Sequence, residues 1–506
     1  MLHKILLCIP FVIPTAAAGD RPNIVFVYAD DHAERAVGAY GSPLTKTPHI
    51  DALAAEGVRF RNSFVANSIC GPARATVLTG LHSHANGKKH NGGGFKDELP
   101  TWAKLLQASG YQTAMIGKWH IGPKPSGFDH WAIAKGGYYG PTMVTAEGKT
   151  KTAGYTTEVI TQASLDWIKS SLEADEPFAI WINHAASHRT WMPGPQYHDR
   201  YAEQVLPEPS SLFDDYAGRS PGAAASQMRI ARDLFGAYDL KLPPEEGEVL
   251  GKRGNDLLNS MTETQRSAWE AAYGPRNAAF AKAGLEGDAL VRWKYQRYIR
   301  DYLRCVDALD DSLGQVRSFL KDNGLADNTI VIYSSDQGFF LGEHGWYDKR
   351  WMYEPSMRTP LIIHDPRAKS QGIVVDQLVQ NIDMAPTILE YAGLEVPSSM
   401  HGASLASLAE EKQGPDWRTS IYYHYQQRDS GRTSHTVAPH YGVRTKQHKL
   451  IHVYDFDAWE LYDLEGDPDE MHNLFGTEGA GEITATLVRE LQRLREKFQD
   501  GTGKAI

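Results

Sequence analysis

The sequence has few cysteines, no long hydrophobic run and no excess of positive charge. Only Cys8, Cys70 and Cys305 occur among 506 residues, and the plain interpretations of the last two are one disulfide bond or two inert core thiols. No later segment offers the roughly 18 consecutive apolar residues of a membrane-spanning helix, so we expect no stable membrane insertion. The 52 basic and 62 acidic residues give a net charge of −10, which argues against a nucleic-acid partner.

The first 18 residues have the layout of a secretory signal peptide. Lys4 precedes an apolar run, residues 5–14, and small residues follow up to Ala18. The run is too short to span a bilayer permanently, and Leu7 stands before Cys8 where lipidation requires a small residue. We therefore expect cleavage after Ala18 and a periplasmic or secreted mature protein.

Short apolar runs alternate with amphipathic stretches along most of the chain. The runs NIVFVYADD, YQTAMIGKWH, FAIWINHAASH and NTIVIYSSDQG break into polar residues at their ends. TPHIDALAAEG and TWAKLLQASG are typical of helices. This alternation predicts an α/β fold with a large mixed, mostly parallel sheet sandwiched by helices.

The alternation is interrupted once and changes again near the C-terminus. Residues 201–290 are polar and rich in Ala, Pro, Glu and Gly, with helical stretches and little strand signal, which indicates an inserted surface or lid region. Aromatic-rich, strand-like runs from about Pro415 and a charged final helix predict a small antiparallel sheet with one helix. We expect a main domain at 19–414 and a C-terminal α+β subdomain at 415–506.

Paired oxygen donors follow two of the apolar runs. Asp30 and Asp31 end the first run, and Asp336 and Gln337 end the last one. In largely parallel sheets, ligands bind outside the carboxyl ends of the strands. Carboxylate and amide oxygens there suit a hard divalent cation such as calcium. One acidic pair is more often a helix cap or a solvated turn, whereas two pairs at strand ends of one sheet indicate a metal site.

Cationic and imidazole side chains lie at or near the same strand ends. They are Lys118, His120, His184, His188, Lys349 and Arg350. Each of them alone would more often be a solvent-exposed or structural residue. Together they meet the needs of a tetrahedral oxyanion, because cations neutralise the anion and a histidine can exchange a proton near neutral pH.

Cys70 opens an expected helix in NSICGPARATVLTG, where Pro72 suits the first turn. A helix N-terminus favours negative charge, so one interpretation is a reactive thiolate with a lowered pKa. Two facts oppose it: a thiolate oxidises readily in an oxidising compartment, and a soft sulfur suits a hard-cation site poorly. Cys305 lies in an amphipathic helix, where a buried thiol is expected.

These motifs resemble those of the type I sulfatases, the formylglycine-dependent members of the alkaline phosphatase superfamily. CGPAR matches the C-x-P-x-R core of that family, whose cysteine is oxidised after translation to formylglycine (3-oxoalanine). Asp-Asp, C-x-P-x-R, GKWH, a histidine after the next strand, SDQG and a lysine follow in family order across nearly the whole mature chain. The segment from SDQG to RTPL is most similar to glycan sulfatases, including those for N-acetylglucosamine 6-sulfate and iduronate sulfate.

The resemblance implies a role for each matching residue. The implied calcium ligands are Asp30, Asp31, the modified Cys70, Asp336 and Gln337. The implied catalytic residues are Cys70, Arg74, Lys118, His120, His188 and Lys349. Arg74 would hold the formylglycine hydrate, His188 would protonate the leaving alcohol, and His120 would deprotonate the hydrate to expel sulfate. Gly71 stands where many relatives have Ser or Thr, and Gln337 where many have Asn or His.

The resemblance also implies partners for the protein. The substrate would be a sulfated polysaccharide or oligosaccharide, and a formylglycine-generating or anaerobic sulfatase-maturating enzyme would modify Cys70. The candidate substrate contacts are His344, Arg350, His440 and Arg444, for each of which an ordinary surface role is the alternative. Two other functions stay open: a phosphonate monoester or phosphodiester hydrolase of the same superfamily, and a non-catalytic exported glycan-binding protein.

Overall fold

The structure is a computed structural model that describes residues 21–505 except 370, 412–415 and 429–434. The expected signal peptide, residues 1–18, and the expected boundary at 414/415 lie outside the described residues. In these ranges, every helix is either too short or too polar to cross a membrane.

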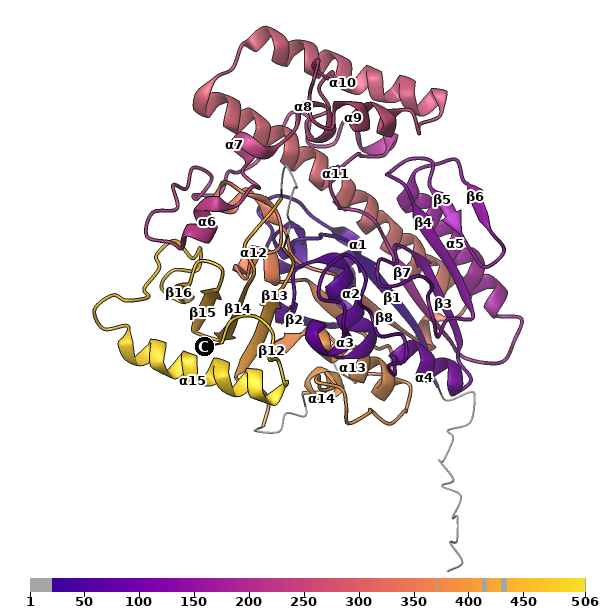
Figure 1. The fold of residues 1–506 in the computed structure, drawn as a ribbon. Helices are drawn as coiled ribbons and strands as arrows, with labels where there is room; N and C mark the ends of the chain where they lie inside the picture. The colour runs from indigo at the N-terminus through magenta and orange to yellow at the C-terminus, as the bar shows by residue number, and fades with distance from the viewer. Residues whose placement is uncertain (1–20, 370, 412–415, 429–434, 506) are drawn as a thin grey trace, which may run out of the picture.

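A ten-stranded sheet forms the centre of the molecule (Figure 1). From one edge to the other its strands are β12 (Ile373–Gln380), β2 (Val58–Phe64), β11 (Leu361–His364), β8 (Thr329–Ser335), β1 (Asn23–Ala29), β7 (Phe178–Asn183), β3 (Gln112–Gly117), β4 (His130–Lys135), β5 (Thr142–Val144) and β6 (Lys149–Lys151). The neighbours of β1 and β3 all run parallel to them, whereas β11, β5 and β6 pair antiparallel.

Both faces of this sheet are buried under helices because successive side chains of a strand point to opposite sides. Along β1, Val25 and Val27 pack into one apolar cluster and Ile24 and Phe26 into another. The first cluster includes side chains of α1 (Pro48–Glu56), α5 (Thr156–Ser171) and α11 (Gly287–Asp322). The second includes side chains of α2 (Cys70–Thr79), α4 (Trp102–Ala108) and α13 (Met384–Tyr391). The predicted fold class is therefore confirmed.

Residues 201–290 form helices and loops, and this stretch contains no strand. Its helices are α6 (Pro221–Ala225), α7 (Ile230–Asp233), α8 (Gly236–Asp239), α9 (Gly251–Leu258) and α10 (Glu263–Ala283). A capping box between Thr262 and Gln265 starts α10, because each side chain satisfies a backbone N–H of the first turn. In Figure 1, α10 and the outer end of α11 project beyond the rest of the molecule.

The C-terminal part adds a four-stranded antiparallel sheet with one helix. The strands are β13 (Ser420–Tyr425), β14 (His440–Thr445), β15 (His448–Val453) and β16 (Ala458–Asp463), and the helix is α15 (Gly481–Lys497). Leu487, Leu491 and Leu494 of α15 pack on one face of this sheet. The backbone N–H of His424 donates to the carbonyl of Ala66 at 2.9 Å, which ties β13 to the loop before α2.

Short elements complete the described chain. They are several short 3-10 helices, the helices α3 (Ser83–Asn86), α12 (Glu354–Met357) and α14 (Ala406–Ala409), and the paired strands β9 (Phe340–Leu341) and β10 (Tyr347–Asp348). The β9–β10 hairpin follows β8 directly and carries the chain from one strand end to Lys349.

Candidate active site

The register of the parallel strands brings the predicted site residues to one edge of the sheet. Tyr28 in β1 pairs with Asn183 in β7, which in turn pairs with Gly117 in β3, and Ala29 pairs with Ser335 in β8. The residues that follow these positions are therefore neighbours in space. They are Asp30 and Asp31 after β1, Lys118 after β3, His184 after β7, and Asp336 and Gln337 after β8.

Three carboxylates lie together at this edge. Oxygen atoms of Asp30, Asp31 and Asp336 lie within 4.8 Å of one another, and all three side chains are fully buried. The backbone N–H of Asp31 donates to Asp336 Oδ1 at 3.1 Å. Burial together with the charge of Asp30 holds the pKa of Asp336 well above its usual range, and burial raises the pKa of Asp31 to about 6.

Three cations pair with these carboxylates. Lys118 Nζ forms an ion pair with Asp30, and Lys349 Nζ lies 2.7 and 2.5 Å from the two oxygens of Asp31. Arg74 Nε donates to Asp336 Oδ2 at 3.0 Å. Burial opposes ionisation of Asp30, yet the charge of Lys118 holds its pKa well below the usual range. The site therefore concentrates charge of both signs. All of these side chains are buried except that of Lys118, which is 17% exposed, so the electrostatic interactions among them are stronger than in water.

Cys70 is the first residue of α2, a helix whose ten residues are all buried. Its Sγ belongs to a second group of possible metal ligands, with Asp30 and His188, whose atoms lie within 4.8 Å of one another. Burial raises the pKa of the thiol, but Lys118 and Lys349 outweigh burial and hold this pKa well below its usual range. Cys305 is also a free, buried thiol, so the alternative of a disulfide bond between the two cysteines is wrong.

The space beside Cys70 explains why glycine follows it. A Cβ atom added at Gly71 would lie 2.8 Å from Lys88 Cε, 2.9 Å from the carbonyl oxygen of His120 and 3.1 Å from Asn91 Oδ1. The N–H of Gly71 donates to this Asn91 oxygen at 3.0 Å. The volume that a larger side chain would take is therefore already occupied by a backbone oxygen and two side chains.

Asn183 is a site residue that the sequence pattern did not single out. Arg74 Nη1 donates to Asn183 Oδ1 at 2.6 Å and to the carbonyl of Lys118 at 3.2 Å. Together with the bond to Asp336, these contacts fix the guanidinium on both sides. In the sequence, Asn183 is only the last residue of a buried strand, which gives no sign of this role. The contact with Arg74 of α2 becomes visible only in the structure.

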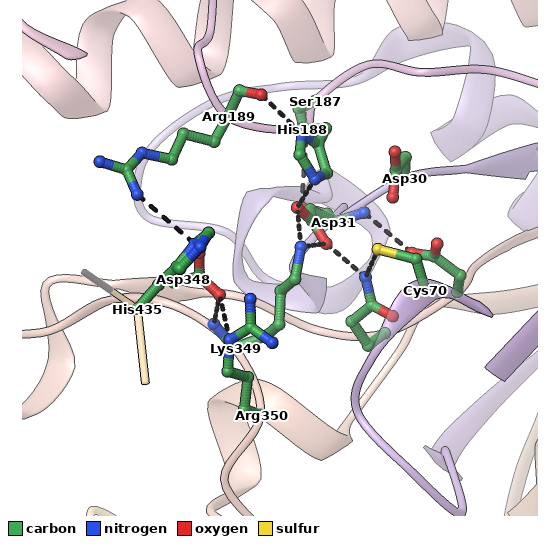
Figure 2. Close-up of polar contacts among 12 residues, drawn as sticks. Asp30, Asp31, Cys70, Ser187, His188, Arg189, Asp348, Lys349, Arg350 and His435 are labelled. Carbon is green, nitrogen blue, oxygen red and sulfur yellow. Dashed lines mark hydrogen bonds and ion pairs between the residues drawn. The ribbon is translucent and has the colours of Figure 1, made fainter. Parts of the chain in front are cut away.

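The loop that carries Lys349 has a strained backbone. Asp348 and Arg350 have φ angles of 80° and 92°, a region that non-glycine residues rarely adopt. Such conformations cluster at functional sites, where the surroundings hold them in place. Figure 2 shows Lys349 reaching Asp31, with Asp348, Arg350 and His435 on the side of Lys349 away from Cys70. His435 Nδ1 lies 3.0 Å from Asp348 Oδ2, a partner that sequence reasoning also missed.

Two histidines border the carboxylate cluster. His188 is 37% exposed, with Nε2 3.9 Å from Asp31 Oδ2 and Nδ1 2.5 Å from the carbonyl oxygen of Arg189. His120 interacts with Cys70, and burial lowers the pKa of its imidazole. His184 points away from the cluster, since its Nε2 lies 3.0 Å from Ser312 Oγ on α11.

A cavity of about 680 Å³ opens beside these residues and is called the active-site cavity below. Its lining includes the buried Asp30, the half-buried Lys118 and His188, and the exposed His120. Its rim carries the basic residues Lys135, Lys151 and Arg253. The last of these, like Tyr238, belongs to the region 201–290, so this region forms part of the wall.

The four residues predicted to contact substrate are all buried. His344, Arg350, His440 and Arg444 are 1%, 2%, 0% and 3% exposed, so the alternative of an ordinary surface role is wrong. Arg350 lies beside Lys349, whereas His344 contacts Arg219 and Asp214, and Arg444 contacts Glu354. None of the four belongs to the described lining of the active-site cavity. Their role in substrate contact stays a prediction.

The donor set at the strand ends suits a divalent cation. Asp30 Oδ1 and Gln337 Oε1 are buried and have no hydrogen-bond partner among the described residues. Gln337 instead directs Nε2 at Asp31 Oδ1 and at Cys70 Sγ. Because amide oxygen and nitrogen exchange places on a 180° flip, Gln337 can present its oxygen there. Three carboxylates and an amide oxygen are ligands of a hard cation.

Comparison with known proteins gives consistent matches along the chain. A family model described as "Sulfatase" matches residues 22–394, and one described as "N-sulphoglucosamine sulphohydrolase, C-terminal" matches residues 342–497. An N-acetylglucosamine-6-O-sulfatase of Bacteroides thetaiotaomicron is 43% identical over 491 residues, which cover 95% of this chain and 87% of that protein.

Solved structures extend this similarity to three dimensions. A structure in complex with its substrate, D-glucosamine-2-N,6-O-disulfate, matches with a TM-score of 0.91 at 42% identity, and covers 95% of this chain and 99% of that one. A phosphonate monoester hydrolase of Agrobacterium radiobacter matches with a TM-score of 0.70 at 20% identity, over 94% and 96% of the two chains. At that identity the second match shows a shared fold only.

Proposed function

The chain belongs to the sulfatase family and hydrolyses sulfate esters, and we propose that it removes the 6-O-sulfate of a glucosamine unit in a sulfated saccharide. The observation that carries the proposal is the near full-length match in sequence to a protein described as an N-acetylglucosamine-6-O-sulfatase, together with the match to a structure whose bound substrate carries a 6-O-sulfate. The buried acid–base cluster that opens into the active-site cavity supports it with geometry.

We propose calcium and a formylglycine at position 70 as the two groups that complete the site. A hydrated formylglycine supplies an oxygen nucleophile, and a calcium ion supplies positive charge beside the reacting sulfate group. Asp30, Asp31, Asp336 and Gln337 would hold the ion, which is supported by their burial and by the two orphaned oxygens. A formylglycine-generating or anaerobic sulfatase-maturating enzyme is the corresponding partner during maturation.

Fixed cations would bind the sulfate group. Lys118 and Lys349 both direct Nζ into the cluster and lie close enough to Cys70 to dominate its electrostatics. They would hold two sulfate oxygens and stabilise the charge that develops on them, without reorganising during the reaction. Arg74 would orient residue 70 and Asp336, because hydrogen bonds to Asp336 and Asn183 hold its guanidinium in place.

His188 is placed to give a proton to the leaving alcohol. Its Nδ1 lies against the carbonyl of Arg189 and therefore carries a hydrogen, which leaves Nε2 directed at the cluster. Protonated at Nε2, it would donate to the ester oxygen on the side of the cavity. His120, which contacts residue 70 and whose pKa is lowered by burial, would accept the proton that leaves the second hydroxyl as sulfate is expelled.

The active-site cavity has the size and charge for an anionic sugar. Its volume of about 680 Å³ lies within the roughly 300–1,000 Å³ of small-molecule sites. Lys135, Lys151 and Arg253 on its rim would attract further sulfate or carboxylate groups of the substrate against the net negative charge of the protein. We propose that the enzyme meets this substrate in the periplasm or outside the cell, after cleavage of residues 1–18.

Defined saccharides test the proposal. Protein matured together with a sulfatase-modifying enzyme is incubated with glucosamine carrying a single sulfate at the 6-O, 3-O or N position, and released sulfate is measured. We expect release from the 6-O ester alone. Release from another position but not from 6-O would refute the assignment. Faster hydrolysis of phenylphosphonate esters than of any sulfate ester would favour the phosphonate hydrolase alternative instead.

A further inference from the structure

A second cavity lies in the projecting helical arm, between α10, the outer half of α11 and the loop that contains Ala202 (Figure 1). It has a volume of about 220 Å³. It is called the arginine cavity below, because Arg276, Arg297, Arg300 and Arg304 line it together with Trp293, Ala202 and Ala279. None of these residues lines the active-site cavity.

The helix periodicity places the charges on one side of α11. Trp293, Arg297, Arg300 and Arg304 follow the spacing i, i+4, i+7, i+11, which is one face of an α-helix. Arg276 faces them from α10, one turn before Ala279. Like charges at such spacings destabilise a helix, so this arrangement calls for a compensating negative charge.

The protein supplies only part of that compensation. Arg304 donates to Asp301 Oδ1 at 2.8 Å, and Arg276 lies 3.3 Å from the largely exposed Asp199. Asp301 is shared with Lys241, whose Nζ lies 3.5 Å from it. Within the described residues, neither Arg297 nor Arg300 has a carboxylate within ion-pair distance.

The pKa shifts of Arg297 and Arg300 agree with this shortage of carboxylate partners. Burial lowers the pKa of Arg297; Asp301 and Tyr273 oppose this shift in part, and Arg276 and Arg304 add to it. Burial likewise lowers the pKa of Arg300, with Arg304 as the next cause. The charged guanidinium is therefore less favourable at both positions than in water, as expected for a cluster that lacks its counter-charge.

The guanidinium groups are held by carbonyls and still have donors to spare. Arg297 Nε donates to Leu240 O at 3.0 Å, and Arg300 Nε donates to Gln204 O at 3.2 Å. Arg304 Nε donates to Arg200 O at 2.9 Å. The Nη1 atom of Arg276 is buried and has no hydrogen-bond partner among the described residues. These backbone contacts fix the arginines in place before any ligand arrives, which lowers the entropic cost of binding.

We propose that the arginine cavity is a non-catalytic anion site that holds a sulfate or carboxylate group of an acidic glycan. A volume of about 220 Å³ is smaller than the roughly 300–1,000 Å³ of sites for whole small molecules, so it suits one anionic substituent with the sugar at its mouth. Arginine pairs bind such planar or tetrahedral oxyanions through parallel N–H bonds. The inference rests on the proposed function only for the choice of a glycan as the source of the anion.

The test compares two pairs of substitutions on the same two helices. In R276Q/R300Q, one arginine of the cavity is removed from α10 and one from α11. In the control R266Q/R292Q, two exposed arginines that pair with Glu270 and Glu208 are removed from the same helices. The probe is a heparin-type octasaccharide without 6-O-sulfates, which keeps its other sulfates and its carboxylates and offers no ester for the proposed reaction.

We expect R276Q/R300Q to bind this octasaccharide at least about tenfold more weakly than the wild type, with a shallower dependence on salt. The control should bind as the wild type does. Hydrolysis of monosaccharide glucosamine 6-O-sulfate should stay within about twofold in both, because the substitutions are remote from the reacting atoms. R300Q alone, at a half-buried position, serves as the second variant if the double substitution impairs folding.

Unchanged octasaccharide binding in a folded R276Q/R300Q protein would overturn the proposal, as would an equal loss in the control. Inorganic sulfate binding as tightly as the octasaccharide would also overturn it, since the cavity would then be a site for small free anions. The binding measurement needs no turnover. A failure of the proposed 6-O specificity is therefore distinguishable from a failure of this inference.

Discussion

Replacing Asn183 by leucine tests the contribution to catalysis of its buried hydrogen bond with Arg74, although it also removes a longer bond, 3.3 Å, from Asn183 Nδ2 to the carbonyl of Trp181. The substitution removes the acceptor that lies 2.6 Å from Arg74 Nη1 and leaves a side chain of similar size. A hydrogen bond to a charged group is worth about 1.5–3 kcal/mol. Arg74 keeps its contacts with Asp336 and with the carbonyl of Lys118, so we expect the guanidinium to tilt and not to leave the site.

If the loss falls on the transition state, kcat/KM for the sulfate ester should fall about ten- to a hundredfold, since about 1.4 kcal/mol corresponds to a factor of ten. Urea unfolding should report a loss of about 1.5–3 kcal/mol. Position 183 lies outside the CGPAR segment, so modification of residue 70, checked by peptide mass spectrometry, should stay complete. N183D, which keeps an acceptor for Arg74, should recover part of the lost activity.

The control is T161V, which removes two buried hydrogen bonds of Thr161 away from the site, one to the carbonyl of Thr157 at 2.8 Å and one with Ser312 at 2.6 Å. At about 0.5–1.5 kcal/mol for each bond, it should lower stability by about 1–3 kcal/mol and leave kcat/KM unchanged. Wild-type kcat/KM in a destabilised N183L protein would refute the reasoning, because Asn183 would then serve the fold alone. An unchanged stability and an unchanged kcat/KM would show that Arg74 does not depend on this bond.

Four further outcomes follow from the geometry. G71A should lose about 1–3 kcal/mol of stability and most activity because its Cβ meets the backbone oxygen of His120, whereas G93A, with open space around it, should change neither in melting and rate assays. Peptide mass spectrometry of matured protein should find residue 70 about 18 Da lighter than cysteine, and an intact thiol in active enzyme would contradict the proposed nucleophile. Chelation should lower the melting temperature and abolish turnover, with calcium restoring both, because a ligand that binds only the folded state stabilises it; unchanged melting after verified metal removal would contradict the cation site. Burial lowers the pKa of His440 to about 3. Below about pH 6.5 the unfolded chain therefore takes up a proton at this histidine and the folded chain does not, which destabilises the wild type as the pH falls. Urea titrations at pH 7 and pH 5 should show that H440N loses about 2 kcal/mol less stability over this interval than the wild type does.

The strand ends were predictable because their chemistry is local in the sequence. Apolar runs that break into Asp30-Asp31 or Asp336-Gln337 identify both the strands and the edge at which they end. The order of strands across the sheet is set by packing between distant segments, so Asn183 could not be recognised as the partner of Arg74. Asp348 and its contact with His435 depend on a strained loop and were equally out of reach.

For residues 201–290 and α11, too, the sequence indicates the secondary structure but not the contacts between distant side chains. The helical and strand-poor character of residues 201–290 was readable from composition, and the structure has helices there. The arginine spacing on α11 is visible in the sequence, but Asp301, Asp307 and Asp310 are interspersed in the same helix and suggest an ordinary charged surface. The structure shows that Asp307 pairs with Arg200 and that Asp310 accepts from the backbone of Ile50, so of these three carboxylates only Asp301 pairs with an arginine of the cavity.

The four central strands β8, β1, β7 and β3 end at the same level of the sheet. The arrangement of the site should therefore be more sensitive to insertions and deletions in these strands than to substitutions. Ala29 pairs with Ser335, and Tyr28 and Gly117 both pair with Asn183, so each predicted site residue at a strand end lies a fixed number of residues beyond these paired positions. Substituting an apolar residue in a strand alters packing locally. Adding or deleting one residue would turn every later side chain of that strand to the opposite face and carry its acid or lysine out of the cluster. Among homologues, we therefore expect the number of residues from the start of each strand to the site residue after it to be nearly constant. The identities of the residues in between should vary more.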